Sequence, residues 1–204
     1  GITVGEDGAT HQMLEDINLM RGLPNMTVIS TSDDTETRAL VKEIAEYNGP
    51  VYLRLSRLKT PIIYTEDQKF EIGKGIQIGK GTDATVFATG VTVAEALQAQ
   101  EELKEEGLDI RIVDIHTIKP IDAELIEKCA RETSILVSVE DHNIIGGLGS
   151  AISEVLTDRD PKKLERLGMH DTFGKSGKPE SLMSYFHIDS ESIKDIIKEK
   201  LYVK

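Results

Sequence analysis

Short β-branched runs alternate along the chain with stretches whose apolar residues recur at helical spacing. A β-branched run bounded by turn residues favours a buried strand, whereas apolar residues three and four apart favour one face of a helix. In the first part of the chain this pattern predicts strands over 2–4, 26–30 and 51–55 and helices over 11–21 and 34–47. Strand, helix and strand joined by short links predict right-handed crossovers and therefore a parallel sheet.

Residues 58–83 interrupt this alternation. Pro61 breaks the pattern, and residues 70–81 alternate only loosely and are rich in Gly and Lys. Such a stretch predicts an extended linker that could hold a small hairpin. We therefore expect a domain boundary here.

From residue 84 onward the strand and helix pattern starts again. Strands are predicted over 84–90, 110–115, 135–139 and 164–169, and helices over 91–106, 122–132, 146–157, 179–185 and 190–201. The fold class is therefore α/β, with two mostly parallel-sheet units, an incomplete one over 1–57 and a second over 84–204. Three strands are few for a closed layer, so 1–57 should leave a sheet edge and an apolar face open. We expect aggregation, dimerisation or disorder there.

Composition narrows the classes of function. The 204 residues carry a net charge of −12, which argues against a nucleic-acid or anionic-membrane surface, since both need clustered Lys and Arg. We see no signal peptide and no apolar run near the length of a membrane span, so we expect a protein of the cytoplasm. Cys129 is the only cysteine, which leaves no disulfide framework or zinc site and favours a buried, inert thiol.

The densest group of chemically active side chains lies at residues 5–12, Gly-Glu-Asp-Gly-Ala-Thr-His-Gln, which we call the polar loop. Asp7 and His11 are four positions apart across a turn, so both could face one cavity and orient and protonate a carbonyl or hydroxyl substrate. Alternatively, Asp7 or Thr10 caps the following helix and His11 is a surface residue. The residues alone leave both interpretations open.

Arg57 follows the predicted strand 51–55. The carboxyl ends of parallel strands form the ligand crevice, so Arg57 and His11 should lie at the same edge of the sheet. A guanidinium there suits a phosphate or a carboxylate. The alternative is a solvated arginine that pairs with a nearby carboxylate.

Other candidates favour structural roles. Residues 146–150, Gly-Gly-Leu-Gly-Ser, resemble a phosphate-binding loop, but their spacing favours a tight turn from strand to helix. The remaining histidines show no metal-ligand spacing, and we interpret them as structural or surface residues; they are His116, His142, His170 and His187. Asp33 and Asp34 are predicted to cap a helix.

Several motifs together resemble the thiamine-diphosphate-dependent transketolases. The polar loop is similar to their G-E-D-G-P-T-H-Q segment, with Ala9 in place of the usual proline, and Leu23-Pro24-Asn25 follows as in that family. Arg57 ends a Leu-Ser-Arg sequence of the same kind. Further matches lie at 116–120 (His-Thr-Ile-Lys-Pro), 139–142 (Val-Glu-Asp-His) and 173–179 (Phe-Gly-Lys-Ser-Gly-Lys-Pro), so the resemblance covers essentially the whole chain.

This resemblance implies an enzyme that moves a two-carbon ketol unit from a ketose phosphate to an aldose phosphate, using thiamine diphosphate with Mg²⁺ or Ca²⁺. His11 should contact the ketol oxygens, Asp7 should bind a sugar hydroxyl, and Arg57 should hold the sugar phosphate. Residues 1–57 would be the C-terminal part of the pyrimidine-binding domain. Residues 84–204 would be the transketolase C-terminal domain, which mainly builds a homodimer and lines no part of the cofactor's reactive centre.

The resemblance also implies missing parts. In the family, the glutamate that protonates the cofactor's aminopyrimidine and the aromatic residues that stack on it lie upstream of the polar loop. We therefore expect a C-terminal section that is inactive alone and needs an N-terminal pyrophosphate-binding domain or a separate subunit. The alternatives are a fragment of 1-deoxyxylulose-5-phosphate synthase, an oxo-acid dehydrogenase β subunit, or a non-catalytic dimerisation module.

Overall fold

The computed structural model describes residues 1–202, which form two β-sheets with helices packed around them. The first sheet has the order β2-β1-β6. Strand β1 (Thr27–Ser30) pairs in parallel with β2 (Val51–Arg54), as the strand–helix–strand pattern predicts. Strand β6 (Thr117–Lys119) comes from much later in the chain and pairs with β1 in the antiparallel sense.

The helix between β1 and β2 forms where the sequence predicts it. Helix α2 spans Asp34–Glu46, and the Asp33 carboxylate accepts a hydrogen bond of 2.7 Å from the backbone N–H of Glu36. Asp33 thus satisfies one of the free N–H groups at the helix start. The predicted cap is confirmed.

The first fifteen residues differ from their prediction. Residues 2–4 lie in a 3-10 helix, η1 (Ile2–Asp7), and not in a strand. The helix expected over 11–21 begins only at Asp16, as α1 (Asp16–Arg21). The Gln12 amide turns inward and donates to the carbonyls of Ile2 and Gly5, at 3.1 and 3.0 Å. These bonds hold the backbone in turns, so local propensity is overridden by side-chain contacts.

The second sheet has the order β3-β5-β4-β7-β8. Its strands are β3 (Ile76–Ile78), β4 (Ala84–Ala88), β5 (Arg111–Asp114), β7 (Ile135–Asn143) and β8 (Leu164–Met169). Four are parallel, and β3 is an antiparallel edge strand on β5. The hairpin suggested for 58–83 is therefore wrong: in the described chain this stretch holds only β3, which pairs with β5 because that edge was free.

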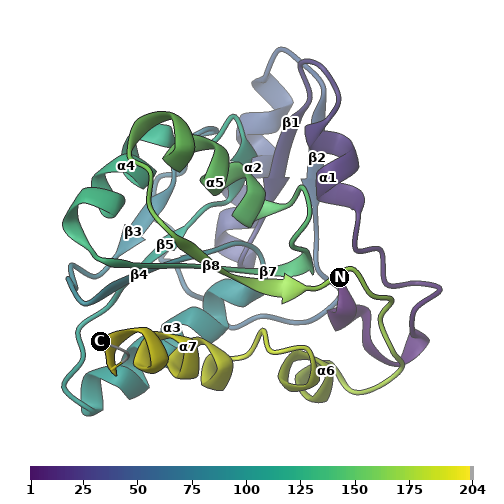
Figure 1. The fold of residues 1–204 in the computed structure, drawn as a ribbon. Coiled ribbons are helices and arrows are strands. Elements are labelled where there is room, and N and C mark those ends of the chain that lie inside the picture. Colours follow the sequence, from purple (N-terminus) through teal and green to yellow (C-terminus); the bar gives the residue numbers. More distant parts are fainter. Residues whose placement is uncertain (203–204) are drawn as a thin grey trace.

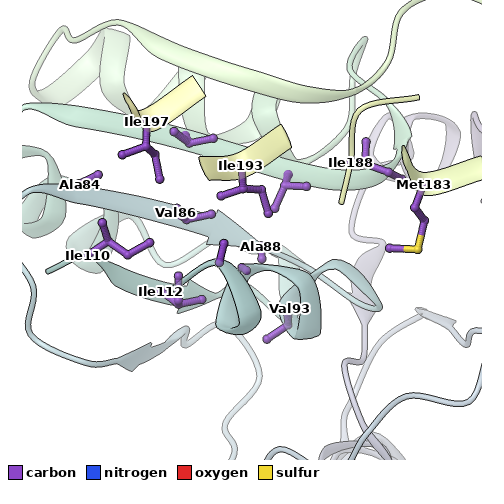
Figure 2. Packing of buried hydrophobic residues seen from close by; sticks show 14 of the residues in the cluster. Ala84, Val86, Ala88, Val93, Ile110, Ile112, Met183, Ile188, Ile193 and Ile197 are labelled. Atoms are coloured by element: carbon purple, nitrogen blue, oxygen red, sulfur yellow. The ribbon is translucent and has the colours of Figure 1, made fainter. Parts of the chain in front are cut away.

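Helices cover both faces of the second sheet (Figure 1). Helices α3 (Thr92–Glu105), α6 (Pro179–Tyr185) and α7 (Ser190–Tyr202) supply residues to the core on one face. Figure 2 shows Ile193 and Ile197 of α7 directed toward Val86 of β4. Helices α4 (Ala123–Glu132) and α5 (Leu148–Arg159) pack on the other face. None of the helices in residues 1–202 has the length and apolar character needed to cross a membrane.

The two units share their core. Ile17 and Val28 of the first unit lie in the same buried cluster as Phe87 and Leu136 of the second. Tyr64 and Phe70, from the stretch expected to be a linker, are each only 8% exposed and pack with Leu40. The open edge expected on the first sheet is also partly absent, because β6 covers β1 and leaves β2 at the edge.

A buried acidic cluster also joins the units. The Glu36 carboxylate accepts hydrogen bonds from the backbone N–H and the hydroxyl of Ser32, at 2.7 and 2.9 Å. Asp114 at the end of β5 accepts one of 2.8 Å from the Tyr64 hydroxyl. Burial raises the pKa of Asp114 to about 7 and that of Glu36 well above its ordinary value, and the negative charge of Asp114 adds to the latter. The cluster thus retains a proton near neutral pH.

We predict that Asp114→Asn flattens the dependence of stability on pH. Burial raises the pKa of Asp114 from 3.8 to about 7, so between these two pH values the folded chain binds more protons than the unfolded chain. The free energy of unfolding should therefore fall as the pH rises from about 4 to about 7, by at least about 1 kcal/mol more in the unmodified chain than in the variant. Urea unfolding across this range measures the difference.

Asp158→Asn is the matched control, since Asp158 is exposed on α5. Its profile should follow that of the unmodified chain. Parallel profiles for Asp114→Asn and the unmodified chain would contradict the prediction.

Candidate functional site

Asp7, His11 and Arg57 meet beside one cavity. The Arg57 guanidinium donates a hydrogen bond to the Asp7 carboxylate. His11 and Arg57 both line a cavity of about 210 Å³. The ion pair is partly open to solvent, with the side chains 64% and 40% exposed, so solvent screening weakens it. The expectation that Arg57 lies at the same edge as the polar loop is confirmed, and so is the pairing of Arg57 with a nearby carboxylate.

The polar loop does not cap the helix behind it. Helix α1 begins at Asp16 and Glu15 occupies its N-cap position; no side chain of residues 1–202 caps it. The alternative in which Asp7 or Thr10 caps this helix is therefore wrong. His11 is exposed, and its Nδ1 lies 3.0 Å from Thr10 Oγ1.

A buried ion pair forms one wall of the cavity. Arg54 Nε donates to Asp16 Oδ2 at 2.7 Å, and the Tyr52 hydroxyl donates to the same oxygen at 2.8 Å. Burial alone would raise the pKa of Asp16, but the charge and N–H groups of Arg54 hold it below its ordinary value. Burial and the Asp16 carboxylate raise the pKa of Tyr52 to about 12. The wall thus combines fixed charges of opposite sign.

The second unit contributes to the same cavity. Gly90, Val91 and Asp141 line it together with Arg57, and Arg54 Nη2 donates to the Asp141 carbonyl oxygen at 3.1 Å. The sequence pattern alone did not indicate Asp16, Arg54 or Asp141 as residues of this cavity. One signal for Asp141 was available: residues 140–142 follow a predicted strand. Side chains at the carboxyl ends of parallel strands face the ligand crevice, and this rule, which was applied to Arg57, applies equally to them.

The glycine-rich residues 146–150 bind the protein's own carboxylate. Glu140 accepts hydrogen bonds from the backbone N–H groups of Leu148 and Gly149, at 2.7 and 2.9 Å, at the start of α5. A Cβ at Gly147 would collide with the Glu140 carboxylate. The turn from strand to helix is confirmed, and Glu140 takes the place that an anion would occupy at this helix N-terminus.

The remaining histidines and Cys129 lie in the core or at the surface, as the sequence predicted. His142 is buried, with its ring nitrogens 3.8 Å from Asp16 Oδ1 and 3.6 Å from Glu140 Oε2. Burial lowers the pKa of His116 to about 4, and Cys129 is buried as expected. His170 and His187 are exposed. Among residues 1–202, His, Cys, Asp and Glu side chains form no group of three or more placed to hold a metal ion.

Both parts of the chain match models of one family. Residues 1–62 match the transketolase pyrimidine binding domain, and residues 73–193 match the transketolase C-terminal domain. These matches leave residues 63–72 between them.

Individual proteins similar to this chain are also transketolase sections or subunits. The chain is 51% identical over 204 residues to a transketolase C-terminal section of Methanocaldococcus jannaschii, covering 98% of this chain and 64% of that protein. It is 39% identical over 193 residues to the 6-deoxy-6-sulfo-D-fructose transketolase subunit SqwH of a Clostridium species, covering 95% of this chain and 60% of that protein. It thus spans about three-fifths of these relatives.

A solved structure has the same fold. A split gene transketolase, in the form of an inactive β4 tetramer, superposes with a TM-score of 0.92 and 42% identity, covering 97% of this chain and 65% of that chain. The motifs, the paired α/β units and these matches agree, so the chain belongs to the transketolase family, with a pyrimidine-binding unit followed by a C-terminal domain.

Proposed function

We propose that this chain supplies the substrate-side residues of a transketolase that moves a two-carbon ketol unit from a ketose phosphate to an aldose phosphate. The observation that carries the proposal is the meeting of Asp7, His11 and Arg57 beside one cavity. These three residues are the ones to which the family resemblance assigns donor recognition. Their contacts are compatible with those roles.

Arg57 is proposed to bind the sugar phosphate. A guanidinium carries five N–H donors, and the ion pair with Asp7 engages only Nη1. Within residues 1–202 the other donors have no hydrogen-bond partner, so they can form the forked contact that a phosphate favours. The Asp7 carboxylate, which lies beside Arg57 in the ion pair, is proposed to accept a hydrogen bond from a sugar hydroxyl.

His11 is proposed to bind the oxygens of the ketol unit. Its Nδ1 lies beside Thr10 Oγ1, which orients the ring. Its Nε2 has no hydrogen-bond partner within residues 1–202. That nitrogen is therefore free to hold or transfer a proton at a substrate oxygen.

Following the family resemblance, we assign the diphosphate of thiamine diphosphate and its Mg²⁺ or Ca²⁺ to a pyrophosphate-binding domain or subunit that works with this chain. The existence of a split gene transketolase, described as inactive as a β4 tetramer, supports this arrangement. Homodimerisation through the C-terminal domain is part of the same proposal.

Assembly with the diphosphate-binding section should be required for activity. The 204-residue chain alone should show no ketol transfer from xylulose 5-phosphate to ribose 5-phosphate, and adding that section with thiamine diphosphate and Mg²⁺ should produce it. Because relatives include sulfofructose and apulose-4-phosphate transketolases, these donors belong in the same assay. Turnover by the isolated chain would contradict the proposal, and turnover only with pyruvate as donor would favour a different enzyme of the wider group.

His11→Ala should lower kcat of the assembled enzyme by about 10²-fold, because it removes the proposed hydrogen bond and proton donor. Steady-state kinetics measures this loss. His170→Ala, at an exposed histidine after β8, is the control and should retain activity. An unchanged rate in His11→Ala would leave His11 with a surface role only.

Arg57→Ala should raise KM for phosphorylated donors by about tenfold or more and change KM for unphosphorylated ketoses much less, because only the former engage the guanidinium. The ratio of the two effects is the measurement. Arg38→Ala serves as the control, since Arg38 is a 74% exposed arginine on α2 that pairs with Asp34. Equal effects on both classes of donor would exclude a phosphate-binding role.

A further inference from the structure

Asp141, in the Val-Glu-Asp-His motif of the second unit, makes its side-chain contacts in the first unit. It lies near the carboxyl end of β7 and is almost fully buried. Its Oδ1 accepts a hydrogen bond of 2.7 Å from the Ile2 N–H. Its Oδ2 accepts bonds from the Thr3 N–H at 3.3 Å and from the Thr3 hydroxyl at 2.5 Å. One carboxylate thus binds three donors in the turn that leads into the polar loop.

These bonds satisfy the start of η1. The first N–H groups of a helix have no partner within the helix, and here a charged acceptor binds two of them. Ile2 and Thr3 are also buried, so their N–H groups are shielded from bulk water. Removal of the carboxylate would leave buried donors without a partner, which costs more than the loss of a solvent-exposed hydrogen bond.

The second unit also holds the far end of the polar loop. Gln12 Nε2 donates to the carbonyl oxygen of Lys175 at 2.8 Å, in addition to its bonds with Ile2 and Gly5. A Cβ at Gly8 would collide with the hydroxyl of Ser176, so the loop and this segment are closely packed. Figure 1 shows the N-terminus beside the end of β7, and η1 also contacts α6.

Between these two attachments, the side chains proposed to meet substrate have few contacts of their own. Asp7 pairs with the exposed Arg57, and His11 contacts only its neighbour Thr10 through a side-chain hydrogen bond within the described chain. Their positions therefore depend on the backbone of the loop. A displacement of about 1 Å at a reacting group is enough to lower a rate by about 10²-fold.

We propose that Asp141 is a positioning residue for ketol transfer: it fixes the start of the polar loop and thereby orients Asp7 and His11 toward the substrate. This rests on the proposed function for the roles of Asp7 and His11. The C-terminal domain then contributes to catalysis through the backbone it holds, in addition to any role in assembly.

Three variants separate positioning from general stability. Asp141→Asn keeps one acceptor oxygen but presents an amide to the Thr3 donors, and Thr3→Val removes the hydroxyl from the other side with little change in shape. Glu140→Gln is the matched control. Glu140 is a buried carboxylate of the same motif that binds the N-terminus of α5 and makes no hydrogen bond to the polar loop within residues 1–202.

Hydrogen–deuterium exchange of the chain, read by mass spectrometry, reports on the loop without any substrate. In Asp141→Asn and Thr3→Val, amides of residues 2–12 should exchange about tenfold faster, and those of α5 should not change. Glu140→Gln should give the reverse pattern. Unchanged exchange over 2–12 in both loop variants would overturn the proposal, and Thr3→Val provides this test even if Asp141→Asn fails to fold.

Kinetics of the assembled enzyme supply the second measurement. Asp141→Asn and Thr3→Val should lower kcat by about tenfold or more. They should change KM for sugar phosphates less, because Arg57, which is proposed to bind the phosphate, lies after β2 and is not part of the polar loop. Equal changes in Glu140→Gln would indicate a structural role and overturn the proposal. Faster exchange over 2–12 with unchanged kcat would show that Asp141 holds the loop but would overturn its proposed role in ketol transfer. The role of His11 is tested independently by His11→Ala, so the two hypotheses fail separately.

Discussion

The antiparallel pairing of β6 with β1 is the interaction on which the arrangement of this chain depends. Without β6, the first sheet would consist of β1 and β2 alone, and two strands are too few for independent stability in water. β6 also brings Ile118 into the buried cluster that contains Val28. Because Arg57 follows β2 and Asp141 lies in β7, joining the units also places these residues beside the same cavity.

Buried carboxylates occur throughout this acidic chain, and the structure stabilises them in two ways. Some stay ionised because donors or cations surround them: Arg54 and Tyr52 bind Asp16 in this manner. The pair formed by Glu36 and Asp114 instead keeps a proton, since burial raises both pKa values. An unpaired buried charge would be very costly. The cavity therefore has fixed charges in its wall, whereas the core between α2 and β5 responds to pH.

Elements with a strong local signal were predicted well. Helix α2 has apolar residues at helical spacing and a capping aspartate, and it was predicted almost to the residue. The parallel strands of the second unit have buried β-branched runs and were also found. The errors lie at 2–15, 58–83 and 117–119. There Gln12 binds the loop backbone, β3 joins a sheet edge, and β6 pairs with β1. All three outcomes depend on partners that a local pattern does not contain.

The candidate site, too, was predicted from the sequence only where its features are local. The order of residues suffices to indicate the α/β class, the family and the three residues Asp7, His11 and Arg57, because motifs and strand ends are local features. It does not show that Asp141 holds the loop or that β6 completes the first sheet. The hydrogen bond between Ile2 and Asp141 joins positions 139 residues apart, and such contacts exist only once the chain has folded. Folding therefore determined how the proposed substrate-side residues are held, and the linear pattern indicated which residues to propose.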